Sequence, residues 1–158
     1  EGCDVAQLQD AAKVFAAGQA AFGIGTLCLR YRSGFVALRP GNQDIALQDF
    51  AAAAVKVFDP FRAALTDAEI ARRRKAKLTA QQDQQMLHWG YPFIFDDFHF
   101  HLTLSGRLGA DDAAHVIDAL APRLENIVPD PFLIDAITLM GQDAQGMFHQ
   151  IHRYALTG

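Results

Sequence analysis

The sequence predicts an α+β protein with small antiparallel sheets and helices packed on one face of each. Three observations carry this prediction. Apolar residues recur at helical spacing in several segments, short β-rich runs are joined by glycine-containing turns, and the two halves of the chain show a similar order of elements. With 158 residues, of which 51% are hydrophobic, the chain is long enough to form one substantial domain.

The first half of the chain is predicted to form a helix followed by two strands. Asp4 is a candidate N-cap, and apolar residues recur from there at helical spacing as far as Phe15. Two β-rich runs follow, at residues 26–31 and 35–38. The Arg-Ser-Gly sequence between them suits a tight turn, so we expect a hairpin.

The middle of the chain is predicted to be mostly helical. A helix starts near Asp44 and is ended by Pro60, because proline disfavours continuation of a helix. Residues 61–89 show a more polar helical pattern, which stops at Gly90. A strand is expected at 98–107, where apolar and polar residues alternate.

The second half continues with a helix and a second hairpin. Asp111 lies in the first turn of the helix, and Pro122 is expected to kink it or end it early. Two strands are predicted at 132–139 and 147–156. Compared with the second half, the first half lacks only an opening strand. We therefore expect two lobes, and a sequence that begins after the first strand of the first lobe. The predicted organisation is one domain, residues 1–158, made of the rest of the first lobe (1–43), a helical connection (44–97) and the second lobe (98–158).

Composition limits the classes of partner. A net charge of −4 and a pI near 5.8 argue against a long nucleic acid as the main partner. No apolar stretch reaches membrane-spanning length and the N-terminus has no signal-peptide pattern, so we expect no membrane partner and a cytoplasmic location. Cys3 and Cys28 form neither a disulfide framework nor a metal-binding spacing.

The strand predicted at 98–107 carries the residues best suited to chemistry. In an extended strand His99, His101, Thr103 and Ser105 share one face. An imidazole can accept or return a proton near neutral pH, and a hydroxyl two residues along can donate a hydrogen bond to an anion. His101 and Thr103 therefore form a candidate half-site for a phosphoryl group. The alternative is a histidine that simply packs in the strand or in a cleft.

Several other residues leave more than one interpretation open. His99 and His101 could hold a metal, but the sequence offers no good third ligand, so we expect neither metal nor cofactor. Arg107 lies on the same strand face, where it could bind substrate or face solvent. Tyr91 belongs to an aromatic cluster that suits either a stacking platform or packing. His149 and His152 are expected on opposite faces of the last strand.

The stretch WGYPFIFDDFHFHLTLSGRL, residues 89–108, resembles the second signature of a bacterial phosphonate-metabolism protein family within the 2H phosphoesterase superfamily. The resemblance implies a two-lobed fold with two HxT motifs, one on a strand of each lobe, facing each other across a cleft. One histidine of such a pair activates the attacking water or hydroxyl, the other protonates the departing oxygen, and no metal is required. The second motif corresponds to His101 and Thr103 as catalytic residues, and the candidate substrate-binding residues are His99, Ser105, Arg107 and Tyr91.

The sequence contains no other HxT or HxS triplet. The family places its first motif just before the segment that residues 1–10 resemble, so this chain is expected to be either truncated or a one-histidine relative. For the intact protein we expect a phosphoesterase or cyclic phosphodiesterase acting on a small phosphate or phosphonate ester. The alternative is a non-catalytic module that binds a nucleotide or phosphonate ester. An incomplete first lobe would also favour a homo-oligomer.

Overall fold

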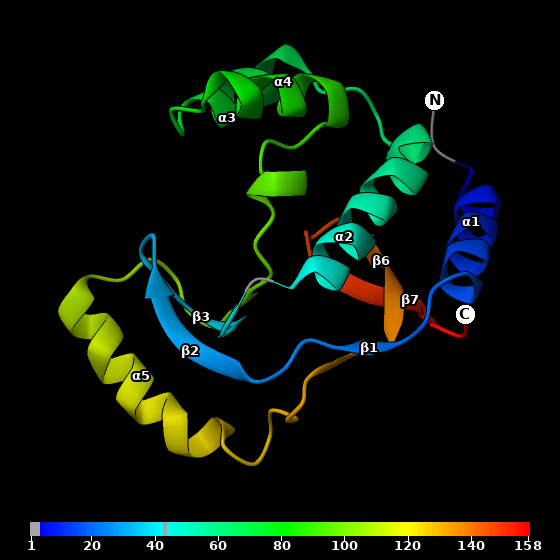
Figure 1. Ribbon diagram of the computed structural model, residues 1–158. Helices are drawn as coiled ribbons and strands as arrows, with labels where there is room; N and C mark the ends of the chain where they lie inside the picture. The colour runs from blue at the N-terminus through cyan, green and yellow to red at the C-terminus, as the bar shows by residue number, and fades with distance from the viewer. Residues whose placement is uncertain (1–3, 43) are drawn as a thin grey trace. The chain divides into compact units, whose positions relative to one another are not determined.

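The computed structural model describes residues 4–42 and 44–158. Over these residues the chain is α+β, with five α-helices and antiparallel strand pairs (Figure 1). It divides into two compact units that interleave in sequence. Unit 1 contains the segments up to Ala21, Ile45–Phe98 and Asp135–Gly158, and unit 2 contains Phe22–Asp44 and His99–Ile134. The division into contiguous segments at 1–43, 44–97 and 98–158 stays a prediction.

Unit 1 packs helices against a hairpin. Asp4 caps the first helix by accepting a hydrogen bond from the Ala6 N–H at 2.9 Å, as predicted. The Phe15 ring lies 5.4 Å from that of Phe50 and 5.5 Å from that of Phe58, joining the first two helices. The elements of unit 1 are α1 (Val5–Ala17), α2 (Ile45–Phe58), η1 (Asp59–Phe61), α3 (Asp67–Arg74), α4 (Ala80–Trp89), η2 (Phe95–Asp97), β6 (Ala136–Gln142) and β7 (Phe148–Ala155).

The polar pattern at 61–89 forms two short helices instead of one. Thr66 begins α3 and Thr79 begins α4, each through a reciprocal capping box. Between them Lys77 has a φ of 52°, a left-handed conformation that interrupts a helix. Gly90 ends α4 with a φ of 80°, in agreement with the predicted stop.

Unit 2 is a three-stranded antiparallel sheet with one helix against it. The sheet order is β2-β3-β4, and β1 pairs with β5 as a separate two-stranded sheet. Ser33 and Gly34 form a two-residue turn with φ values of 55° and 90°, which suits a type I′ hairpin. The elements of unit 2 are β1 (Phe22–Gly23), β2 (Leu27–Arg32), β3 (Phe35–Pro40), β4 (Leu102–Thr103), α5 (Ala110–Leu124) and β5 (Leu133–Ile134).

The strand predicted at 98–107 is much shorter in the structure. Only Leu102 and Thr103 form β4, paired with β3. The regular ladder ends because the Ser105 side-chain hydroxyl, and not a backbone carbonyl, accepts the hydrogen bond from the Val36 N–H at 3.0 Å. The chain nevertheless stays beside β3, since the Leu104 N–H donates to the Val36 carbonyl at 2.9 Å.

Two further elements differ from their predicted extents. Helix α5 continues two residues beyond Pro122, which lies in its last turn. The run predicted as one strand at 132–139 is divided at Asp135: β5 pairs with β1, and β6 pairs with β7. In the described ranges no helix is both long enough and apolar enough to span a membrane.

Candidate functional site

The two faces of the β2-β3-β4 sheet have different environments. Thr103 lies opposite Ala37, which in turn lies opposite Arg30, so these three side chains share one face. Leu102 lies opposite Leu38 on the other face. Leu38 and residues of α5 line a common cavity, so that other face is the one turned toward α5. We call the face of Thr103 the open face.

His101 presents one defined nitrogen as a proton acceptor. Its Nδ1 lies 2.8 Å from the backbone carbonyl oxygen of His99. A carbonyl oxygen only accepts hydrogen bonds, so Nδ1 must carry the proton and neutral His101 keeps its lone pair on Nε2. His101 and Thr103 are both exposed, and the Thr103 hydroxyl has no hydrogen-bond partner among the described residues. Two residues along an extended chain span about 7 Å, which places both groups within reach of one anion.

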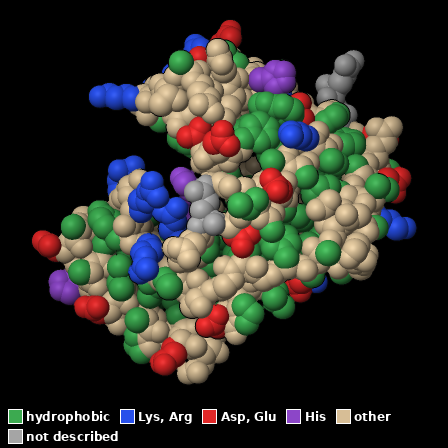
Figure 2. All heavy atoms as spheres, viewed as in Figure 1, with side chains coloured by type: hydrophobic (Ala, Val, Ile, Leu, Met, Phe, Trp, Pro, Cys, Tyr) green, Lys and Arg blue, Asp and Glu red, His purple; other side chains and the backbone are tan. Residues whose placement is uncertain are grey.

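Arginines surround this pair on the open face. Arg39 lies opposite Cys28 and Arg32 opposite Phe35, and both have the same strand parity as Ala37. The Arg107 guanidinium lies over the Phe35 ring, 5.3 Å from its centroid. Figure 2 shows Lys and Arg side chains gathered over the β2–β3 hairpin. Sequence reasoning missed Arg32 and Arg39, because their position beside the His-x-Thr segment depends on strand register.

Among the described residues, no carboxylate compensates the charge of these guanidinium groups. In the described part of the chain no ion pair involves Arg30, Arg32, Arg39 or Arg107. Burial, and secondarily the positive charge of Arg32, lower the pKa of Arg39. A bound anion would offset the repulsion between Arg32 and Arg39, so the open face is suited to phosphate.

The remaining candidate substrate-binding residues contact other parts of the protein. The Ser105 hydroxyl accepts from the Val36 N–H and donates to the Gly106 carbonyl at 2.8 Å, so its proton is already used. His99 contributes its backbone carbonyl to His101. Tyr91 belongs to unit 1, where the Arg73 guanidinium lies 5.2 Å from the centroid of its ring. The structure therefore brings His101, Thr103 and Arg107 to one sheet of unit 2, with Arg32 and Arg39 added.

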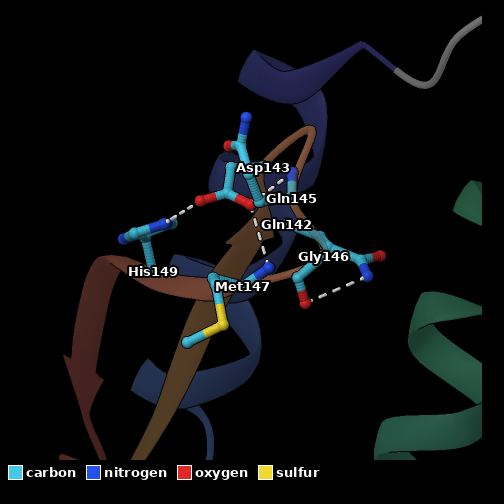
Figure 3. A network of polar contacts seen from close by, with 6 residues as sticks. All are labelled: Gln142, Asp143, Gln145, Gly146, Met147 and His149. Atoms are coloured by element: carbon cyan, nitrogen blue, oxygen red, sulfur yellow. Dashed lines mark hydrogen bonds and ion pairs between the residues drawn. The ribbon is translucent and has the colours of Figure 1, made fainter.

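A second histidine contact lies in the β6–β7 turn (Figure 3). His149 Nε2 lies 2.6 Å from Asp143 Oδ2, while Asp143 Oδ1 accepts from the N–H groups of Gln145 and Met147, each at 2.9 Å. The hydrogen bond with His149, followed by that with the Met147 N–H, holds the pKa of Asp143 below its ordinary value. This network organises the turn.

The prediction that His149 and His152 lie on opposite faces is wrong. His149 pairs with Gly141 and His152 with Leu139, two β6 residues of equal parity. A register shift between Leu139 and Met140 adds one residue to β7, which returns both histidines to the same face.

A cavity of about 580 Å³ lies on the α5 side of the sheet, with mainly apolar walls. Across the described ranges no three His, Cys, Asp or Glu side chains are grouped as metal ligands. Cys28 is a free thiol, and Cys3 lies outside the described residues.

Two curated proteins are similar to this chain, and both are named ribose 1,5-bisphosphate phosphokinase PhnN. The protein from Janthinobacterium sp. (strain Marseille) is 32% identical over 151 residues, covering 92% of this chain and 33% of the relative. The protein from Laribacter hongkongensis (strain HLHK9) is 28% identical over 135 residues, covering 80% of this chain and 31% of the relative. The chain thus spans about a third of the length of these relatives. No solved structure matches it. Residues 1–149 match the model of the DUF1045 proteins of unknown function, and the chain therefore belongs to the DUF1045 family.

Proposed function

We propose that the intact protein is a metal-independent phosphoesterase of the 2H type that hydrolyses a small, preferably cyclic, phosphate ester in phosphonate breakdown. His101 is an acid/base group and Thr103 a donor to a phosphoryl oxygen. The observation that carries the proposal is that His101 and Thr103 are both exposed, and that Thr103 shares its sheet face with Arg32 and Arg39, which have no carboxylate partner among the described residues. The proposed location of this reaction is the cytoplasm.

The hydrogen bond at His101 defines its role in the reaction. With Nδ1–H donated to the His99 carbonyl, Nε2 can take a proton from water as the water oxygen bonds to phosphorus. The ester P–O bond then breaks, and the departing oxygen needs a proton from a second acid. Thr103 and the neighbouring guanidinium groups stabilise the charge on the non-bridging oxygens. In a 2H enzyme the second acid is the histidine of the other HxT motif.

The relatives support a phosphorylated small molecule as the substrate class. Both are named for a kinase that acts on ribose 1,5-bisphosphate. The sequence of this chain has no GxxxxGK[ST] motif for nucleotide phosphates. We therefore assign this segment a hydrolytic role on a related phosphate ester.

The presence of a single HxT triplet in this sequence favours a second candidate, a non-catalytic module that binds a nucleotide or phosphonate ester. Such a module would use Thr103 and the arginines for binding but would not need the Nε2 lone pair of His101. The two functions therefore differ in what substitution of His101 does.

The test is hydrolysis of a panel of cyclic phosphodiesters by the full-length protein. His101→Ala is compared with His115→Ala, since His115 is an exposed histidine on α5 of the same unit. The proposal expects turnover that His101→Ala lowers by about 10²- to 10⁴-fold and that His115→Ala leaves unchanged. Turnover that survives His101→Ala would refute the catalytic assignment, whereas binding without turnover in the wild type supports the second candidate.

A further inference from the structure

Arg107 is held in place at the end of the segment that carries Thr103. From Thr103 this segment runs beside β3, and it is tied to the β2–β3 turn where the Leu108 N–H donates to the Gly34 carbonyl at 2.8 Å. The Leu108 carbonyl in turn accepts from the Tyr31 hydroxyl at 2.9 Å. These two hydrogen bonds fix the backbone next to Arg107 against the hairpin.

The Arg107 side chain lies across the turn and over an aromatic ring. A β-carbon added to Gly34 would lie 3.3 Å from both Cγ and Nη1 of Arg107, so the missing side chain of Gly34 leaves room for this arginine. The guanidinium carbon of Arg107 is 5.3 Å from the centroid of the Phe35 ring, which is a cation–π contact. This contact restricts the rotamers of a long side chain that is otherwise exposed.

Phe35 brings this guanidinium group to the face of Thr103. Phe35 has the same strand parity as Ala37, which lies opposite Thr103, so the Phe35 ring and the Thr103 side chain share the open face. Phe35 and Ala37 are two residues apart along β3, which corresponds to about 7 Å. Two hydrogen bonds of about 3 Å each, with one phosphoryl group between them, span a similar distance.

We infer that Phe35 is a positioning residue, which holds the Arg107 guanidinium group over the open face so that Arg107 and Thr103 bind oxygens of one phosphoryl group. This inference rests on the proposed function and specifies how the phosphoryl group is held. With the described residues the guanidinium group forms no ion pair or hydrogen bond, so its N–H groups can bind the ligand. A side chain that is ordered before the ligand arrives loses less conformational entropy on binding.

The experiment measures binding of inorganic phosphate to the full-length protein by NMR titration. Arg107→Ala should weaken binding at least about tenfold, since it removes a charged hydrogen-bonding partner. Phe35→Leu keeps an apolar side chain but removes the ring, so it should weaken binding about two- to fivefold, whereas Phe35→Tyr should keep the wild-type affinity. In the Arg107→Ala background Phe35→Leu should have no further effect, because Phe35 acts through Arg107.

Two further measurements distinguish positioning from a general effect of charge or structure. Arg123→Ala changes the net charge as Arg107→Ala does, but Arg123 lies on α5, where its Nη1 donates to the Ala119 carbonyl, so phosphate binding should be unchanged. The NMR signals of the Arg107 side-chain protons report the contact with the ring directly. The Phe35 ring current should shift these signals upfield in the wild type and in Phe35→Tyr, and this shift should be lost in Phe35→Leu.

The outcomes separate this inference from the proposed function. Absence of saturable phosphate binding in the wild type, or equal losses in Arg107→Ala and Arg123→Ala, overturns the inference. A Phe35→Leu loss of equal size with and without Arg107 also overturns it, since Phe35 would then act through the structure of the hairpin. If hydrolysis of cyclic esters depends on His101 while Phe35→Leu binds phosphate as the wild type does, the inference fails and the proposed function stands. A Phe35→Leu loss that requires Arg107 supports the inference even where no ester is hydrolysed.

Discussion

Ser105→Ala is expected to destabilise unit 2 while leaving phosphate binding intact. The Ser105 hydroxyl accepts the Val36 N–H at 3.0 Å, and Val36 is 0% exposed. Alanine would leave this buried donor without an acceptor, since water has no access to it. The second hydrogen bond of the hydroxyl, to the Gly106 carbonyl at 2.8 Å, lies at an exposed residue where water can replace it. The cost is therefore that of one unsatisfied buried N–H, about 1 to 3 kcal/mol.

Native-state hydrogen exchange at the Val36 amide measures this cost directly. A loss of about 1 to 3 kcal/mol should reduce the protection of that amide by roughly 5- to 150-fold. Thr103→Val is the matched variant, because the Thr103 hydroxyl has no partner among the described residues. Thr103→Val should keep Val36 protection and weaken binding of inorganic phosphate, the reverse of Ser105→Ala. Unchanged Val36 exchange in Ser105→Ala, together with weaker phosphate binding, would refute the reasoning and make Ser105 a ligand.

Four further variants test other contacts. His101→Asn keeps an N–H near the His99 carbonyl but lacks Nε2, so kcat should fall by about 10²- to 10⁴-fold in steady-state assays. His99→Ala keeps the backbone carbonyl and should keep most of the activity. Similar losses of kcat in both variants would contradict the assigned tautomer. The pKa of Asp143 is lower in the folded protein than in the unfolded chain, where it is about 4. The carboxylate, which is hydrogen-bonded to His149, therefore contributes its full stability above the unfolded pKa. This contribution is lost as the pH falls through the lower, folded pKa. Asp143→Asn should therefore lower Tm near neutral pH and match the wild type in strong acid, and a constant difference across that range would count against the mechanism. Met86→Ala removes a side chain that is 0% exposed, and it should lower the free energy of unfolding by about 2 to 5 kcal/mol in denaturant titrations. A decrease of less than about 1 kcal/mol would show that Met86 is not tightly packed.

Local patterns were sufficient to predict the elements whose signals lie within a few residues. The helix capped by Asp4 is confirmed, as are the helix ended near Pro60 and the hairpin that turns at Ser33 and Gly34. Each of these depends on interactions between residues close in sequence: a side-chain cap, the missing proline N–H, or the φ > 0 of a tight turn. The α+β class follows from the same signals.

Features that depend on pairing between distant segments were not predictable in this way. The alternation at 98–107 is that of a full strand, yet β4 is short because Ser105 bonds to Val36, which is 69 residues away in sequence. The run at 132–139 contains Asp135, a residue type that is depleted in strands, but only the pairing with two different partners shows that the run is divided there. Propensity describes a segment without specifying which strand it will meet.

The positive charge of the candidate site also depends on strand pairing, which the sequence pattern does not specify. Arg32 and Arg39 are ordinary strand residues in the sequence, and they join Thr103 only because the β2–β3 register places them on its face. That register is set by the two-residue turn at Ser33 and Gly34, whose positive φ values suit a type I′ hairpin. A slip of one residue would move every β2 side chain to the opposite face. Arg32 would then point toward α5, so this turn determines whether the face of Thr103 carries the positive charge of Arg32.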